Sequence, residues 1–140
     1  MAFPEFFQLV PSITLHDKLA DTLGAATDGR IEYHYADAVK LAGHSCPTVA
    51  GAWLMASRAL AALYTDSVPE RGNILVELRA TQDAGTAGVV GAVLGLITGA
   101  AGDGGFKGIA GRYVRRDLLR YCVDIDADVR ITRLDTGAAV

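Results

Sequence analysis

Residues 43–64 read GHSCPTVAGAWLMASRALAALY, and this stretch organises the rest of the chain. Pro47 suits the first turn of a helix, because the N–H that proline lacks has no partner there. An apolar stripe follows at helical spacing. Its members are Val49, Trp53, Ala56, Leu60 and Tyr64. We therefore predict a helix over residues 47–64, packed through this stripe on the core.

The other expected elements are shorter and are separated by turns rich in Gly, Pro and Asp. The expected helical segments are 12–25, 37–41 and 86–98, and the expected strands are 31–35, 73–79 and 123–132. Apolar and polar residues alternate along the last strand, which is typical of an antiparallel sheet with one wet face. We predict a single α+β domain over residues 1–140, with helices packed on a mixed or mainly antiparallel sheet.

Composition excludes several classes of protein. The chain has 140 residues, of which 51% are hydrophobic and 21% charged, so it can build a core and is not a disordered chain. The net charge of -3 argues against nucleic-acid binding. Residues 84–102 carry no charge but are rich in glycine, and we expect a buried helix there and no membrane span. Two cysteines and no secretory signal favour the cytoplasm.

The candidate chemistry lies at the start of the predicted central helix. His44 and Cys46 are two residues apart and directly precede the helix. A thiol near a helix N-terminus favours the thiolate, which is the form that binds metals and attacks electrophiles. His34, on the strand predicted at 31–35, is a third candidate ligand. A set of His44, Cys46 and His34 suits zinc or another transition metal.

Three other interpretations stay open. Cys46 can be a structural loop thiol, or it can be a nucleophile with His44 as its base. The third is haem binding, with Cys46 or a histidine as axial ligand and Trp53 lining the pocket beside the small residues of the second apolar helix. With a metal or a haem, a small-molecule ligand is expected to bind at the cofactor.

Two further patterns concern partners. Glycines recur every three or four residues between positions 88 and 99, where they allow another backbone to approach closely, and with the apolar surplus they predict a homodimer. Four arginines form a basic cluster just before the last strand: Arg112, Arg115, Arg116 and Arg120. The plain interpretation is pairing with the aspartates of that strand at 124, 126 and 128, and the alternative is an anion-binding rim.

Residues 42–52, AGHSCPTVAGA, resemble the signature of the FmdE-like family, which is named after a component of formylmethanofuran dehydrogenase. That family carries a His-Gly-His-x-Cys-Pro-Gly run before a helix, and His44 and Cys46 match its motif. The resemblance implies an α+β domain, often dimeric, with a metal near this loop.

The chain departs from the family pattern at several points. The first histidine of the motif is Ala42 here, and the glycine after Cys-Pro is Thr48. The family's second cysteine-bearing segment corresponds to residues 83–90, which contain no cysteine. The ligand set is therefore altered, and His34 is a compensating candidate.

Overall fold

The computed structural model describes residues 1–140 and has an α+β fold built on two small mixed sheets. The first sheet has the order β2 (Arg30–Tyr33), β1 (Ile13–Asp17) and β3 (Glu70–Arg71). The second has the order β5 (Leu119–Arg120), β4 (Ile74–Leu78) and β6 (Val129–Arg133). In each sheet the central strand is antiparallel to one neighbour and parallel to the other. The α+β class is confirmed, but with two sheets in place of one.

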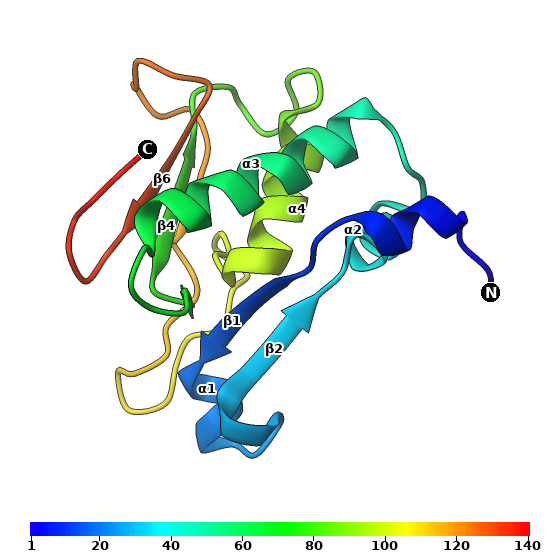
Figure 1. Cartoon of the computed structure of the whole chain (residues 1–140). Helices are drawn as coiled ribbons and strands as arrows, with labels where there is room; N and C mark the ends of the chain where they lie inside the picture. The colour runs from blue at the N-terminus through cyan, green and yellow to red at the C-terminus, as the bar shows by residue number, and fades with distance from the viewer.

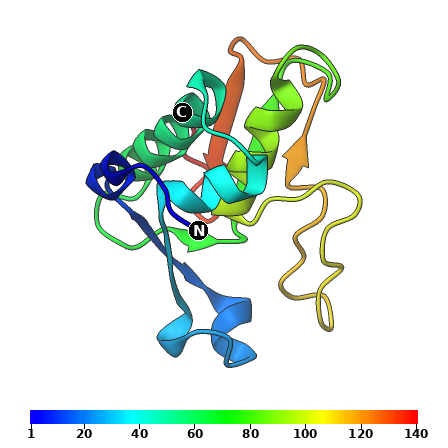
Figure 2. The same ribbon diagram turned by 90° about the vertical axis from the view of Figure 1, so that its right-hand side faces the viewer.

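Two helices, α3 (Pro47–Leu63) and α4 (Ala87–Thr98), pack against each other and against the β4–β6 pair (Figure 1). The hairpin of β1 and β2 extends away from them toward α1 (Lys18–Thr22) and the 3₁₀ turn η2 (Thr27–Gly29) (Figure 2). The 3₁₀ segment η1 (Glu5–Leu9) lies beside α2 (Tyr35–Ala42). No helix combines the length and the apolar character that crossing a membrane requires.

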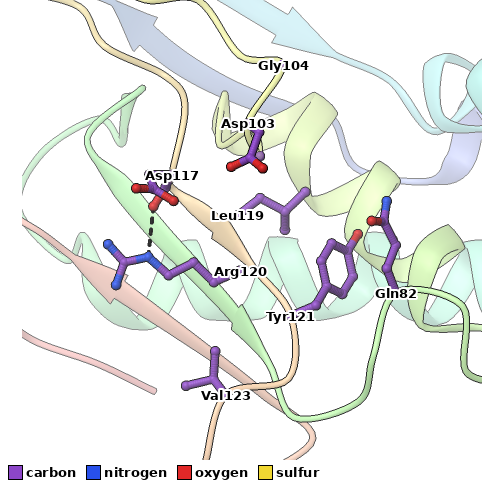
Figure 3. A pocket seen from close by; sticks show the side chains of 9 residues that line it. Gln82, Asp103, Gly104, Asp117, Leu119, Arg120, Tyr121 and Val123 are labelled. Atoms are coloured by element: carbon purple, nitrogen blue, oxygen red, sulfur yellow. Dashed lines mark hydrogen bonds between the residues drawn. The ribbon is translucent and has the colours of Figure 1, made fainter.

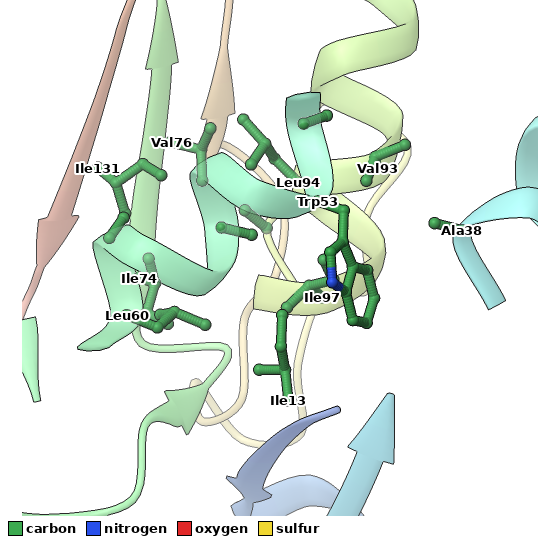
Figure 4. Close-up of a cluster of buried hydrophobic side chains, with 14 of the residues drawn as sticks. Ile13, Ala38, Trp53, Leu60, Ile74, Val76, Val93, Leu94, Ile97 and Ile131 are labelled. Atoms are coloured by element: carbon green, nitrogen blue, oxygen red, sulfur yellow. The ribbon is translucent and has the colours of Figure 1, made fainter. Parts of the chain in front are cut away.

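The core lies between α3, α4 and the two central strands (Figure 4). Its fully buried large side chains come from all four elements: Leu15, Trp53, Ile74, Leu94 and Ile97 are among them. Burying each such side chain stabilises the fold by roughly 1.5–3 kcal/mol. The helix predicted at 47–64 is thus confirmed within one residue, and its predicted stripe faces the core.

The first predicted helix, 12–25, is wrong over its first half. Residues Ile13–Asp17 form β1, whose alternate residues Ile13, Leu15 and Asp17 are buried. Buried residues recur here at every second position, as in a strand. The third buried residue is the carboxylate Asp17, so a search for alternating apolar residues misses the strand. Asp17 then accepts hydrogen bonds from the amides of Leu19 and Ala20 at 2.9 and 3.1 Å and starts the short helix α1.

The last predicted strand, 123–132, is also shorter than expected. Only Val129–Arg133 forms β6, which pairs with all five residues of β4. Cys122 has a left-handed φ of 58°, and the amide of Ile125 donates to the carbonyl of Val123, which turns the chain before β6. Alternating polarity is therefore present, but only Val123 and Asp128 hydrogen-bond to the end of β4, at Leu78 and at the following Arg79, so residues 123–128 form no continuous strand.

A buried ion cluster joins β1, β3 and the segment before β5. Arg115 donates to Asp17 through both terminal nitrogens, at 2.7 and 3.3 Å, and Arg71 donates to the same carboxylate at 3.0 Å. Burial by itself raises the pKa of Asp17, but the hydrogen bonds from Arg115 and Arg71 outweigh it and hold the pKa below its usual value of 3.8. Arg71 also donates to the carbonyl of Leu96 in α4. The predicted pairing of the basic cluster with the aspartate row is therefore wrong for Arg115.

Other segments of the same chain pack directly against the glycines of α4. A Cβ on Gly95 would lie 2.7 Å from the carbonyl oxygen of Ala100, and one on Gly88 would lie 2.9 Å from that of Gln82. A Cβ on Gly91 would overlap the hydroxyl of Tyr121. The close approach predicted for this stripe exists, but the approaching groups are intramolecular, so the stripe lends no support to a homodimer.

Replacing Asp17 by alanine should lower the free energy of unfolding by about 3–5 kcal/mol, because the buried guanidinium of Arg115 and the half-buried one of Arg71 lose their counter-charge. Urea unfolding at pH 7 measures the loss. The control is Asp128→Ala, which removes an exposed pair with Arg79 and should cost less than about 1 kcal/mol. Equal losses in the two variants would contradict the role given to the buried cluster.

Gly95→Ala should destabilise the fold by about 1–3 kcal/mol, since the new methyl group meets a backbone carbonyl that cannot rotate away. Gly51→Ala, in α3, is the matched control because a Cβ there meets nothing within 4 Å. This second substitution should stabilise the helix by up to about 1 kcal/mol. Thermal unfolding of both variants checks the opposite signs, and stabilisation by Gly95→Ala would refute the close packing.

Candidate functional site

The loop between α2 and α3 holds the candidate site. Gly43 ends α2 with a left-handed φ of 78°, and Cys46 is the N-cap of α3. The loop is fixed from both sides. Nδ1 of His44 donates to the carbonyl of Ala42 at 3.1 Å, and the hydroxyl of Ser45 is hydrogen-bonded to that of Tyr35 at 2.7 Å. The predicted position of His44 and Cys46 at the start of the central helix is confirmed.

His44 and Cys46 act on each other electrostatically. The amide of Val49 has the largest effect and lowers the pKa of the Cys46 thiol. Burial opposes it, and the amide of Thr48 and the ring of His44 lower the pKa further. None of these amides makes a side-chain capping hydrogen bond of standard geometry with the sulfur. In turn, the carbonyl of Ala42 and then the Cys46 thiol raise the pKa of His44. Each of the two groups therefore stabilises the charged form of the other.

The tautomer of His44 follows from its hydrogen bond. A carbonyl can only accept, so Nδ1 carries the proton in the neutral ring and Nε2 keeps its lone pair. A backbone carbonyl on one ring nitrogen is the usual support for a histidine that binds metal through the other. His44 is exposed and Cys46 half-buried, so both are open to a ligand from solvent.

His34 lies elsewhere. It precedes α2, where its amide donates to Asp37 at 2.8 Å, and its Nε2 is 3.4 Å from a carboxylate oxygen of Glu32. Its side chain is 62% exposed. The chain contains no group of three His, Cys, Asp or Glu side chains arranged to hold a metal ion. The structure therefore brings His44 and Cys46 together and leaves His34 apart from a joint site.

Trp53 is a core residue. It is 1% exposed and meets the ring of Tyr35 edge to face, with 6.0 Å between the ring centroids. It has almost no exposed surface, and its role in cofactor binding stays a prediction. His44 and Cys46 also line none of the larger surface pockets.

A pocket of 680 Å³ lies beside α4, between Gln82 and the loop that begins at Gly102 (Figure 3). Its wall carries Asp103, Asp117 and Tyr121, with Arg120 donating to the carbonyl of Asp117 at 2.9 Å. The loop packs on residues 115–119 through backbone hydrogen bonds. From the sequence, this glycine-rich loop is interpreted as a flexible connection that approaches the loop of His44 and Cys46. Asp117 adopts a left-handed φ of 65° in the wall, and no sequence pattern marks that conformation.

No family model, curated protein or solved structure matches the chain. The resemblance carried by residues 42–52 thus remains a prediction.

Cys46 should react with iodoacetamide at pH 7 faster than an ordinary thiol, because its pKa is lowered by the helix amides and by His44. The rate is measured against pH in a Cys122→Ser background, which leaves Cys46 as the only thiol. His44→Ala should shift the reactivity profile toward higher pH and slow the reaction at pH 7 several-fold. His34→Ala serves as control and should change nothing. A profile insensitive to His44 would refute the coupling.

Proposed function

We propose that the protein binds a transition metal, with zinc the best match to the ligands, through His44 and Cys46, and that it works in the cytoplasm. The observation that carries the proposal is the thiol of lowered pKa beside an imidazole whose Nε2 is left free by the bond from Nδ1 to Ala42. A thiolate and a neutral imidazole are both preferred zinc ligands. The resemblance to FmdE-like proteins supports the same residues.

A single chain supplies two ligands at this loop, whereas zinc takes four in structural sites. We propose that a second copy supplies the other two, which gives a His₂Cys₂ site on the axis of a homodimer. The exposure of His44 and the position of the loop on the surface allow such a contact. With a catalytic site, one position would instead be filled by water or by a small-molecule ligand.

The test is zinc binding by competition with a chromophoric chelator, together with the molar mass in solution. One zinc ion should be bound per two chains, and chelator should return the dimer to monomer. Cys46→Ser and His44→Ala should each weaken zinc binding at least roughly tenfold, because each removes a ligand. Cys122→Ser is the matched cysteine control and should bind zinc as the parent does.

The His34→Ala variant tests whether His34 is a ligand of the metal. Unchanged affinity and half-stoichiometry support the shared site, whereas a loss equal to that of His44→Ala would assign His34 to the site and overturn the two-chain arrangement. Zinc content unaffected by both Cys46→Ser and His44→Ala would overturn the metal site altogether.

The second candidate is an enzyme with Cys46 as nucleophile, and the lowered thiol pKa is the specific observation in its favour. In that case His44 stabilises the thiolate and zinc inhibits the reaction by occupying the sulfur. Haem is the third alternative, for which the buried Trp53 offers no support. A Soret band in the absorbance of the purified protein would favour haem over both.

A further inference from the structure

A separate small pocket of 230 Å³ lies where β3 meets the segment before β5. It is smaller than the 300–1,000 Å³ typical of pockets for drug-sized ligands. Four cationic side chains stand in its wall, namely Lys18, Arg71, Arg112 and Arg115, and Glu70 is its only carboxylate. These residues come from α1, from β3 and from the segment before β5, so only the folded chain brings them together.

Arg115 is the fixed element of this pocket. Its side chain is 8% exposed, and Asp17 holds the guanidinium end-on through its two terminal nitrogens. Its Nε is buried and donates to nothing. A buried donor without a partner costs about 1–3 kcal/mol, which the fold tolerates here. Any side chain at Gly72 or Gly99 would collide with this guanidinium, so the local backbone is built around it.

A second buried atom in the same wall is also unpartnered. Glu70 accepts a hydrogen bond from Nδ1 of His16 at 2.7 Å through Oε2, while its Oε1 is buried and accepts from nothing. Two residues of the pocket wall thus each keep one unused polar atom beneath the surface, a donor on Arg115 and an acceptor on Glu70, which a ligand reaches only by displacing the atoms that cover them. A ligand that satisfies both needs an anionic group and a hydroxyl close to it.

The charges of the site do not balance. The four cations of the wall face two carboxylates, Asp17 from behind Arg115 and Glu70 in the wall, which leaves an excess of two positive charges. Lys18 makes no salt bridge, and Arg112 stacks over the ring of Tyr113 at 5.1 Å without an acidic partner. A dianion would neutralise the excess.

We propose that this pocket binds the phosphate group of a small hydroxylated phosphate ester. The Nε–H of Arg115 donates to a phosphate oxygen, and Arg112 and Lys18 close on the dianion from the rim, where charge-assisted hydrogen bonds to phosphate are strong. A hydroxyl on the carbon next to the ester donates to Oε1 of Glu70. None of these residues belongs to the loop of His44 and Cys46, so this site is independent of the proposed metal site.

The experiment is calorimetric titration of the whole protein at fixed low ionic strength with inorganic phosphate, glycerol 3-phosphate and glycerol. Both phosphates should bind, glycerol 3-phosphate more tightly, and glycerol should not. Arg112→Ala and Lys18→Ala, both at exposed positions, should each weaken binding roughly tenfold, the loss expected for one hydrogen bond to a charged group. Arg116→Ala is the matched control, an exposed arginine outside the pocket, and should change affinity less than about twofold.

Glu70→Gln tests the choice of ligand. Removing the negative charge should strengthen the binding of inorganic phosphate, while the advantage of glycerol 3-phosphate over phosphate should shrink because an amide oxygen accepts a weaker hydrogen bond than a carboxylate oxygen. No heat at millimolar phosphate, or equal losses in Arg112→Ala and Arg116→Ala, would overturn the site. An unchanged preference for the glycerol ester in Glu70→Gln would overturn the hydroxyl contact.

Discussion

The carboxylate of Asp17, held between Arg71 and Arg115, is the contact on which the arrangement of this molecule depends. It ends β1, caps α1 and ties the segment before β5 to the first sheet. A buried pair of this kind adds little net stability compared with apolar packing, because desolvating the charges is costly. We expect its value to lie in specificity, because any other arrangement of the chain would leave the buried guanidinium of Arg115 without this carboxylate.

The molecule has two chemically distinct regions. The loop with His44 and Cys46 owes its properties to local geometry, since the amides at the start of α3 and the neighbouring imidazole set the state of the thiol. The pocket around Arg115 owes its properties to the global fold, since its cations come from three separate segments. A soft pair open to solvent suits a metal or an electrophile, and a recessed cationic pocket suits a small anion.

Short sequence patterns predicted the helices correctly. They failed for segments whose structure depends on which other strand they pair with. The helix at 47–64 and the helix at 86–98 are confirmed nearly to the residue, because proline, glycine and helical spacing act within one turn. The segment 12–25 became a strand over Ile13–Asp17, because β2 and β3 flank it. The glycines of α4 were correctly expected to allow close approach, but the sequence could not identify Ala100 and Tyr121 as the groups that approach.

The sequence alone predicts a thiol and an imidazole at the start of the central helix, because Cys46 directly precedes Pro47 and His44 is two residues away from Cys46. Folding in three dimensions was needed to place His34 beside Glu32, apart from that pair, and to bring Arg115 to Asp17 across 98 residues of chain. Local spacing fixes neighbours along a helix or a turn. The partner of a distant charge depends on how whole strands and loops pack, and no short pattern encodes that choice.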